Sequence, residues 1–185
     1  MTIFENKKLE RDKFRKLRDV ISLNQRKNVE KNVRLYVNSF VKGYKNIGYI
    51  AIYWPLHNEV DIRILKENFS LALPRCNEKK ELLFYPWDEK PLTKDSEGIL
   101  SPDNSFSLSH KQISMIFVPC LSVDKNLIRL GYGGGYFDKL RRNKNWRNVP
   151  CIGVLTSNCV STIPLTRAEW DIPLSGFITE KEILV

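Results

Sequence analysis

The sequence predicts an α/β fold, and three observations lead to this prediction. The first 42 residues place apolar side chains at helical spacing. After residue 42, short apolar runs rich in β-branched and aromatic residues recur to the end of the chain. Shorter helical or polar segments separate these runs. Strands that alternate with helical segments favour a sheet whose strands are joined by crossover connections.

The N-terminal segment predicts two successive helices. Their apolar positions are Leu9, Phe14, Leu17 and Ile21 in the first helix and Val29, Val33, Val37 and Phe40 in the second. Ser22 and Gln25 form the pattern of a capping box, in which the two side chains satisfy free backbone N–H groups at a helix start. Gly43 is a typical helix stop, so the second helix is expected to end there.

The rest of the chain predicts a sheet within a single domain that spans residues 1–185. The expected strands lie in the runs 46–54, 70–74, 81–87, 113–121, 149–155 and 175–179. Short helices are expected at 59–68 and 134–143. Residues 86–112 are rich in Pro, Asp, Ser and Gly, which indicates a long surface excursion with two short hairpin-like pieces.

The charge of the chain is concentrated at one end. The formal net charge is +9, and residues 1–45 contain 13 Lys and Arg against 5 Asp and Glu. A basic segment favours an anionic partner such as nucleic acid, a membrane surface or a phosphorylated small molecule. Four widely spaced cysteines without a C-x-x-C pair predict reduced thiols in an intracellular protein. No apolar run is long enough to cross a membrane, and no secretory signal is visible.

The stretch RLGYGGGYFDKL, residues 129–140, is the strongest candidate for a binding site. It follows a predicted strand and leads directly into a predicted helix, and backbone amides at such a position bind anions. Arg129 can add a charge-assisted contact, and Asp138 is placed to hold a divalent cation against phosphate oxygens. The spacing matches neither the Walker pattern nor a dinucleotide fingerprint, so a turn that merely allows tight packing remains an alternative.

Three further segments are candidates for the same chemistry. One face of the first helix carries Lys7, Arg11, Arg15 and Arg18. This face is either a cationic surface directed at a polyphosphate or an ordinary solvated face. In YWPLHNEVDI, residues 53–62, aromatic side chains beside Glu59 are suited to a flat heteroaromatic ring, although Glu59 also fits the first turn of a helix. Asp171 in RAEWDIP is a turn acid, or a second metal ligand beside Asp138.

In this order, the segments resemble the 5-formyltetrahydrofolate cyclo-ligase family over about residues 7–182. The resemblance rests on KKLERDKFRKLR, YWPLHNEVD, GILSPD, FVPCLSVDKNLIRLGYGGGYFDKL and IPLTRAEWDIPLSGFIT. It implies a three-layer α/β/α sandwich with a mostly parallel sheet, similar to the ribose-phosphate isomerase and CoA-transferase group. It also implies a cytoplasmic, monomeric enzyme that uses ATP and Mg²⁺ to convert a reduced folate, 5-formyltetrahydrofolate, into 5,10-methenyltetrahydrofolate.

The resemblance also implies roles for individual residues. Arg129 and Tyr136 would be catalytic, Asp138 and Asp171 would hold Mg²⁺, and Trp54 and Glu59 would bind the pterin ring. Gly133, Gly134 and Gly135 would also face the folate, together with Tyr132 and Tyr136. The ATP-binding set would be Lys7, Lys8, Arg11, Arg129, Leu130, Gly131, Tyr132, Gly133, Gly134, Gly135, Tyr136 and Phe137.

Four positions depart from the family pattern, and two alternative functions stay open. The departures are Ser101, Phe137, Cys159 and Trp170. They favour, as one alternative, a protein that binds or stores folate without turning over ATP. The basic N-terminal helix favours, as the other, a nucleic-acid-binding module whose affinity would fall steeply with salt. Aromatic residues do not interleave with the basic stripe, which weighs against the second alternative.

Overall fold

The computed structural model describes residues 2–44, 46–88 and 90–185. It begins with the two expected helices, α1 (Ile3–Asp19) and α2 (Leu23–Lys42). Each starts with a capping box, formed by Thr2 with Glu5 in α1 and by Ser22 with Gln25 in α2. Gly43 caps the end of α2 with helical rather than left-handed backbone angles, so the predicted stop is confirmed.

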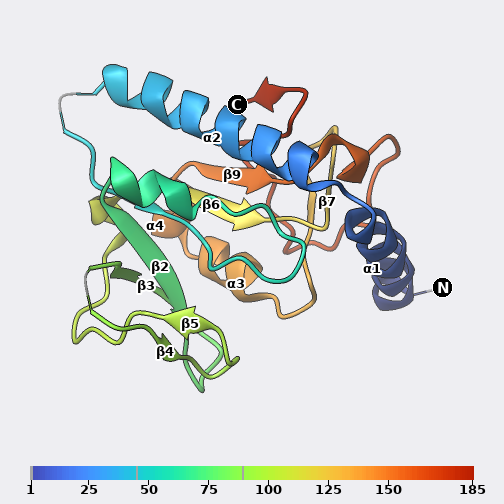
Figure 1. Cartoon of the computed structure of the whole chain (residues 1–185). Helices are drawn as coiled ribbons and strands as arrows, with labels where there is room; N and C mark the ends of the chain where they lie inside the picture. Colours follow the sequence, from blue (N-terminus) through green and yellow to red (C-terminus); the bar gives the residue numbers. More distant parts are fainter. Residues whose placement is uncertain (1, 45, 89) are drawn as a thin grey trace.

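A seven-stranded sheet forms the centre of the molecule (Figure 1). Its strands, in spatial order, are β12 (Ile183–Leu184), β11 (Gly176–Ile178), β9 (Cys151–Val154), β6 (Ile113–Pro119), β1 (Tyr49–Ala51), β2 (Leu71–Cys76) and β3 (Leu82–Pro86). The five inner strands are parallel, and the two edge strands pair antiparallel. The predicted α/β fold with a mostly parallel sheet is confirmed.

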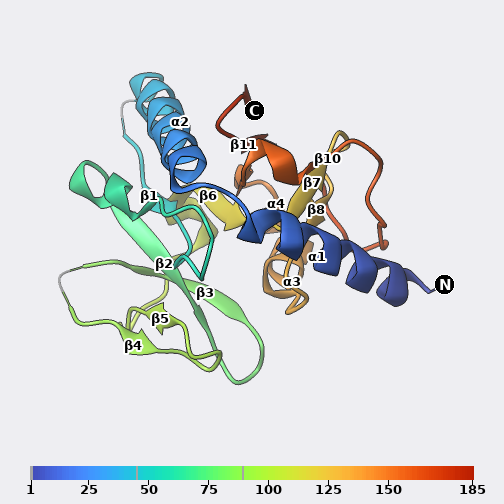
Figure 2. The same ribbon diagram turned by 45° about the vertical axis from the view of Figure 1, so that its right-hand side comes forward.

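The sheet is buried on both faces, which explains why its strands read as continuous apolar runs. Ile50 and Ile52 pack toward α2, whereas Ala51 between them belongs to the core cluster on the opposite face. That opposite face is covered by α3 (Tyr136–Arg142) and α4 (Lys144–Arg147), so the layers follow the order helix, sheet, helix (Figures 1 and 2).

The remaining elements are short. A two-stranded hairpin joins β4 (Thr93–Lys94) to β5 (Leu100–Ser101), and a small sheet contains β10 (Val160–Ser161), β7 (Ser122–Asp124) and β8 (Arg129–Leu130). The 3-10 helices are η1 (Arg63–Glu67), η2 (His110–Gln112) and η3 (Ser157–Cys159). The helix predicted at 59–68 is therefore only η1. In 86–112 the expected hairpins reduce to β4–β5 and one isolated bridge, Phe84 to Leu108.

The topology of the sheet determines where a ligand can bind. From β1 the chain proceeds to its neighbour β2, and it later returns to β6 on the other side of β1. Ligands of open α/β sheets bind beyond the carboxyl ends of strands at such a reversal of strand order. Trp54 follows the end of β1 and Pro119 ends β6, so these residues mark that position. Among the described helices, none has the length and apolarity needed to cross a lipid bilayer.

Candidate active site

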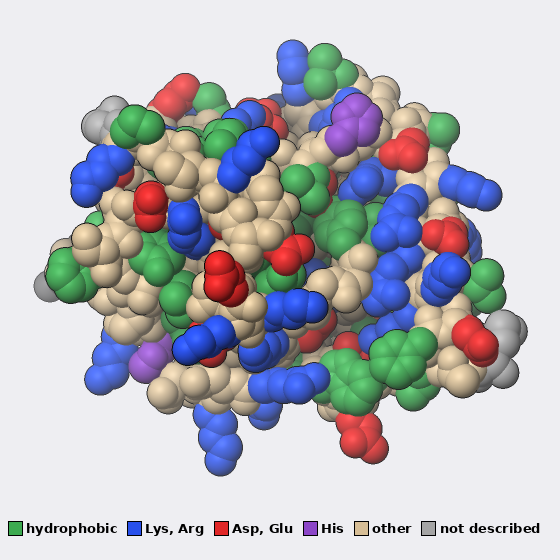
Figure 3. Space-filling model, turned by 90° about the horizontal axis from the view of Figure 1, so that it is seen from below, with side chains coloured by type: hydrophobic (Ala, Val, Ile, Leu, Met, Phe, Trp, Pro, Cys, Tyr) green, Lys and Arg blue, Asp and Glu red, His purple; other side chains and the backbone are tan. Residues whose placement is uncertain are grey.

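A cavity of about 440 Å³ opens at this carboxyl edge of the sheet and forms the hollow in the centre of Figure 3. The predicted site residues that line it are Lys7, Arg11, Trp54, Glu59, Arg129, Leu130, Gly131, Tyr132, Gly133, Gly134, Gly135, Tyr136, Phe137, Asp138 and Asp171. Lys8, which was predicted to contact ATP, is exposed and lies outside the lining. The structure thus gathers four segments that are far apart in the sequence.

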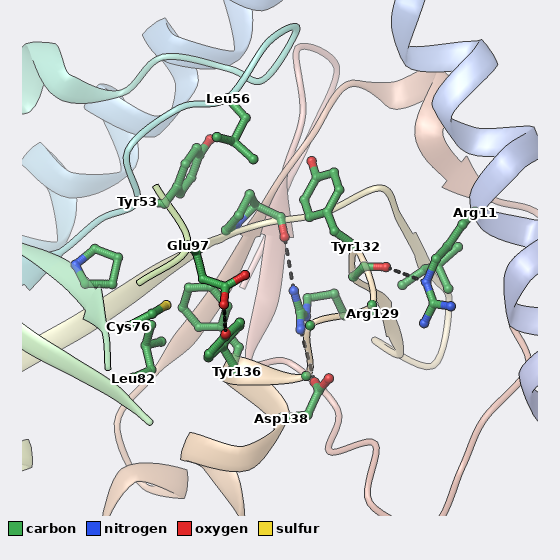
Figure 4. A pocket seen from close by; sticks show the side chains of 18 of the residues that line it. Arg11, Tyr53, Leu56, Cys76, Leu82, Glu97, Arg129, Tyr132, Tyr136 and Asp138 are labelled. Atoms are coloured by element: carbon green, nitrogen blue, oxygen red, sulfur yellow. Dashed lines mark hydrogen bonds and ion pairs between the residues drawn. The ribbon is translucent and has the colours of Figure 1, made fainter. Parts of the chain in front are cut away.

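The loop of glycines lies at the floor of this cavity and turns into α3 (Figure 4). Gly133 has φ of 110° and Gly135, the residue that caps α3, has φ of 70°. Residues that carry a side chain rarely adopt such positive φ angles, so the path of the loop requires glycine at both positions. Because α3 has only seven residues, its dipole is small, and the cationic side chains around the loop supply most of the attraction for an anion.

The inward face of α1 supplies two of these cations along the loop. Arg11 donates from Nε to the carbonyl oxygen of Gly131 over 2.9 Å, and Arg18 donates to the hydroxyl of Tyr132 over 2.6 Å. Arg15 was predicted to share this face, but it is exposed and pairs with Asp12 instead. The basic stripe of the sequence is therefore divided between the cavity and the solvent.

Each predicted metal ligand forms an ion pair in this structure. Asp138 Oδ1 accepts from Arg129 over 3.1 Å, and Asp171 Oδ2 pairs with Lys7 and accepts from the amide of Ala168. The described residues contain no cluster of three or more metal-binding side chains. Within the same residues, Asp138 Oδ2 and Asp171 Oδ1 have no protein hydrogen bond. Two carboxylates on one cavity fit Mg²⁺, which is commonly held by one or two carboxylates together with substrate phosphates.

Arg129 has a more structural setting than its predicted catalytic role suggests. Its guanidinium donates to the carbonyl oxygen of Pro119 over 3.2 Å as well as to Asp138, and only 8% of its side chain is exposed. Burial opposes its charge, but the adjacent Asp138 raises the pKa of Arg129. Arg129 therefore joins the end of β6, the glycine loop and α3 in one charged contact.

The opposite end of the cavity contains Glu59. Its Oε2 accepts from the amide of Leu56 over 2.7 Å, while its Oε1 is buried without a hydrogen-bond partner among the described residues. Burial raises the pKa of Glu59, and the hydroxyl of Tyr132 opposes that shift. An unpaired buried acceptor is costly, so this oxygen is suited to a ligand that brings its own N–H donor.

Aromatic side chains border Glu59. Trp54 lines the cavity and packs against Trp87 at a centroid distance of 6.0 Å, with the guanidinium of Arg63 over its ring at 4.4 Å. Tyr53, which belongs to the same sequence segment but was given no role of its own, donates its hydroxyl to the carbonyl oxygen of Val60 over 2.7 Å and also lines the cavity. A flat ring with polar edges fits this end of the cavity.

The β4–β5 hairpin forms a further side of the cavity, which the sequence did not predict. Glu97, in the turn of the hairpin, accepts a hydrogen bond from the hydroxyl of Tyr136 across the cavity (Figure 4). This contact raises the pKa of Tyr136 to about 12. The turn itself is visible in the sequence as Asp95 followed by Gly98, but no local signal connects Glu97 with a residue 39 positions away.

The four departures from the family pattern leave the cavity open. Trp170 lies on its lining beside Asp171, and Phe137 packs its ring under Arg129 at 5.4 Å. Ser101 is fully buried and accepts from Arg75 over 3.1 Å. Cys159 is buried and lies outside the main cavity.

Several known proteins are similar to this chain in sequence or in structure. A curated relative from Haemophilus influenzae, a 5-formyltetrahydrofolate cyclo-ligase, is 27% identical over 175 residues, which cover 89% of this chain and 92% of the relative. A solved structure of 5,10-methenyltetrahydrofolate synthetase from Aquifex aeolicus is 27% identical, with a TM-score of 0.75 over 96% of this chain and 91% of that one. The synthetase structure from Mycoplasma pneumoniae has 23% identity and a TM-score of 0.71, over 95% and 99% of the two chains, and supports the fold.

The profile of one protein family covers almost the whole chain. It matches residues 3–180, a range that contains every residue described above as lining the cavity. The chain therefore belongs to the 5-formyltetrahydrofolate cyclo-ligase family.

Proposed function

We propose that this protein catalyses the ATP- and Mg²⁺-dependent cyclisation of 5-formyltetrahydrofolate to 5,10-methenyltetrahydrofolate, with release of ADP and phosphate. The observation that carries the proposal is the arrangement of one cavity. A cationic glycine loop with two carboxylates lies at one end, and a buried, unpaired carboxylate oxygen among aromatic rings lies at the other. Such a cavity matches a polyphosphate and a flat heterocycle that must react with each other.

The reaction requires the formyl oxygen to become a leaving group. That oxygen attacks the γ-phosphorus of ATP, the bond to the β-phosphate oxygen breaks, and ADP departs. N10 of the folate then attacks the formyl carbon and loses its proton, and the bond between that carbon and the phosphorylated oxygen breaks, so that phosphate leaves as the ring closes. Positioning and electrostatic stabilisation supply most of the acceleration in phosphoryl transfer, and the cavity is built for both.

The residues divide these tasks between the two ends of the cavity. Glu59 Oε1 accepts from an N–H group on the edge of the pterin, and Trp54 packs beside the ring. Lys7, Arg11 and the amides of the glycine loop hold the phosphates. Asp138 and Asp171 would hold Mg²⁺, which would supply positive charge against the phosphate oxygens. Asp171 is paired with Lys7 in this structure, so both side chains would exchange this ion pair for contacts with the metal and the nucleotide.

The placement of α1 weakens the nucleic-acid alternative, because it turns three of the basic side chains toward the cavity. Lys7, Arg11 and Arg18 face the interior and contact Asp171, Gly131 and Tyr132, so they do not form an exposed basic surface.

The monomeric state and the cytoplasmic location stay predictions. The four cysteines are all buried and free, which fits a reducing compartment.

A single-vessel assay tests the proposal. The purified protein is mixed with 5-formyltetrahydrofolate, ATP and Mg²⁺, and the near-ultraviolet absorbance of the methenyl product is followed together with ADP. Stoichiometric formation of both products supports the enzyme. Calorimetric binding of the folate without ADP formation would instead identify a binding or storage protein, and absence of both signals rejects the assignment.

A further inference from the structure

A second, much smaller cavity adjoins the Glu59 end of the site and has no part in the proposed chemistry. Its volume is about 20 Å³, and most of its lining is apolar. Arg18 from the last turn of α1 is part of that lining. Glu59, Pro119 and Tyr132 line both this small cavity and the main one, so they form the boundary between the two.

Two polar atoms at the small cavity are buried without a hydrogen-bond partner among the described residues. They are Nε of Arg18, which is a donor, and Oε1 of Glu59, which is an acceptor. Buried polar groups that lack a protein partner are commonly joined by an ordered water, which makes about three hydrogen bonds and needs roughly 10–15 Å³. The small cavity therefore has room for one water, and the hydroxyl of Thr156 in the same lining offers a third partner.

Arg18 also acts directly on Tyr132. Its Nη1 donates to the Tyr132 hydroxyl over 2.6 Å, and the centre of its guanidinium lies 5.2 Å from the centroid of the ring. Because a guanidinium has only donors, the phenolic oxygen is the acceptor in this contact, and the phenolic proton is free for another acceptor. Burial raises the pKa of Tyr132 well above its ordinary value, so this proton is retained. The carboxylate on the same boundary is Glu59.

Several elements place titratable groups around Glu59. Those that line the small cavity or lie beside Glu59 in the main one are Arg18 of α1, Tyr53 after β1, Cys120 after β6, Tyr132 of the glycine loop and Cys159 of η3. Outside both linings are Asp19 and Arg26, which hydrogen-bond to Asn58, and His57 and Asp61, which are close to Glu59 in the chain. Arg18 is thus the cation that faces Glu59 among these described groups.

The charge of Arg18 has a defined effect on Glu59. Burial raises the pKa of Glu59, and the hydroxyl of Tyr132, the amide of Leu56 and the charge of Arg18 oppose that shift. Burial also raises the pKa of Tyr53 and of the two neighbouring thiols, so these groups are neutral near neutral pH. Removal of the Arg18 cation therefore leaves the Glu59 carboxylate with no compensating charge from this set.

We propose that Arg18 is a positioning residue for the folate site, and that it acts on Glu59 through Tyr132 and through one water in the small cavity. These contacts hold the Glu59 carboxylate as the acceptor for an N–H group on the edge of the ring. A carboxylate oxygen accepts more than one hydrogen bond, so Oε1 can serve the water and the ligand together. Arg18 is not part of the main lining and touches no reacting atom. The inference deepens the proposed function and rests on it for the identity of the ligand.

The first test requires no ligand. The carboxyl carbons of isotope-labelled glutamate are titrated by NMR, and the Glu59 signal is identified by its loss in Glu59→Gln. Arg18→Met should raise the midpoint of Glu59 by about one pH unit, a tenfold change in proton affinity. Arg18→Lys keeps the charge and should recover part of this shift. Arg15→Met is the control, because Arg15 is exposed and pairs only with Asp12, so the midpoint should not move.

Tyr132→Phe provides a second variant in case Arg18→Met fails to fold. It removes only the hydroxyl and should move the Glu59 midpoint in the same direction, because that hydroxyl opposes the effect of burial. A crystal structure of the wild type should show one water within hydrogen-bond distance of Arg18 Nε and Glu59 Oε1. A dry small cavity would overturn the part of the inference that depends on water.

The second test measures the ligand without ATP. 5-Formyltetrahydrofolate is titrated calorimetrically into wild type, Arg18→Met, Glu59→Gln and the double variant. Arg18→Met should weaken folate binding about tenfold at neutral pH, as expected for a misplaced or protonated acceptor. On acidification its affinity should fall at a higher pH than that of the wild type. In the Glu59→Gln background the same change should alter affinity by less than about twofold, because Arg18 acts through the carboxylate.

The outcomes separate this inference from a merely structural role for Arg18. Equal Glu59 midpoints in wild type and Arg18→Met would overturn it, as would a loss of folate affinity that is the same with and without the Glu59 carboxylate. Equal weakening of ATP, titrated with Mg²⁺, would indicate a general loss of structure and would also overturn it. A wild type that binds no 5-formyltetrahydrofolate would refute the proposed function, whereas the ligand-free titration would still decide whether Arg18 acts on Glu59.

Discussion

The guanidinium of Arg18 lies 2.6 Å from the hydroxyl of Tyr132, so the last turns of α1 are joined to the glycine loop across 114 positions of sequence. Both side chains also line a small cavity of about 20 Å³ with Glu59. The N-terminal helix therefore connects the glycine-loop end of the cavity with the Glu59 end. The predictions below examine contacts along this helix and across the cavity.

Glu59→Gln should weaken folate binding and raise the thermal stability of the unliganded protein at neutral pH. Burial raises the pKa of Glu59 above its ordinary value of 4.5, so the native state favours the neutral carboxyl. The neutral Glu59 carboxyl therefore contributes to folding stability. This contribution is complete below pH 4.5 and is lost as the pH rises through the raised folded-state pKa. Thermal unfolding followed against pH should show a stability gain at neutral pH that vanishes in acid. A gain that persists in acid would contradict this origin.

Lys7→Met should lower the free energy of unfolding by about 3–5 kcal/mol, because it leaves Asp171 buried without its cation. The two side chains are only 11% and 6% exposed. Urea unfolding gives the change, and the double variant Lys7→Met/Asp171→Asn should recover most of it. Arg15→Met on the same helix is the control, because the exposed Arg15–Asp12 pair contributes only about 0–1 kcal/mol. Equal losses in Lys7→Met and Arg15→Met would disprove the buried pair.

Asp138→Asn should reduce turnover by at least about a hundredfold, a loss of roughly 3 kcal/mol of transition-state stabilisation. The amide oxygen still accepts from Arg129, so folding should be preserved, whereas the proposed Mg²⁺ site loses an anionic ligand. Turnover is measured by product absorbance, and calorimetry of ATP with and without Mg²⁺ provides a readout that is independent of turnover. Full activity in Asp138→Asn would remove this residue from the metal site.

Glu97→Gln should lower the pKa of Tyr136 from about 12 toward its ordinary value of 10.0, because the hydrogen bond to the Glu97 carboxylate is the main cause of the shift. Because the folded-state pKa is raised, the hydrogen bond from the neutral Tyr136 phenol to Glu97 contributes fully to stability below pH 10.0. This contribution is lost as the pH rises through about 12. Ultraviolet difference titration measures the shift, with Tyr136→Phe subtracted to isolate this tyrosine. An unchanged titration in Glu97→Gln would show that the two residues do not meet.

Local sequence patterns were sufficient to predict α1, α2, six of the seven strands of the central sheet and the position of the glycine loop. The capping box at Ser22, the apolar run that becomes β6 and the glycines of the loop each act over a few residues, so they are visible in the sequence. Contacts between distant segments are not. The inward turn of Arg18 rather than Arg15, the meeting of Glu97 with Tyr136 and the pairing of Lys7 with Asp171 depend on how α1 and the hairpin pack. A short segment such as Arg63–Glu67 also lacks enough residues to distinguish an α-helix from a 3-10 turn.

The position of Thr2 has a practical consequence for work with recombinant material. Thr2 caps the helix whose first turn carries Phe4, so any peptide joined ahead of it would emerge at the entrance of the cavity. A purification handle there would compete with soaked compounds and distort titrations. The other terminus, after β12 at the far edge of the sheet, contributes no residue to the cavity and is the better place for such a handle.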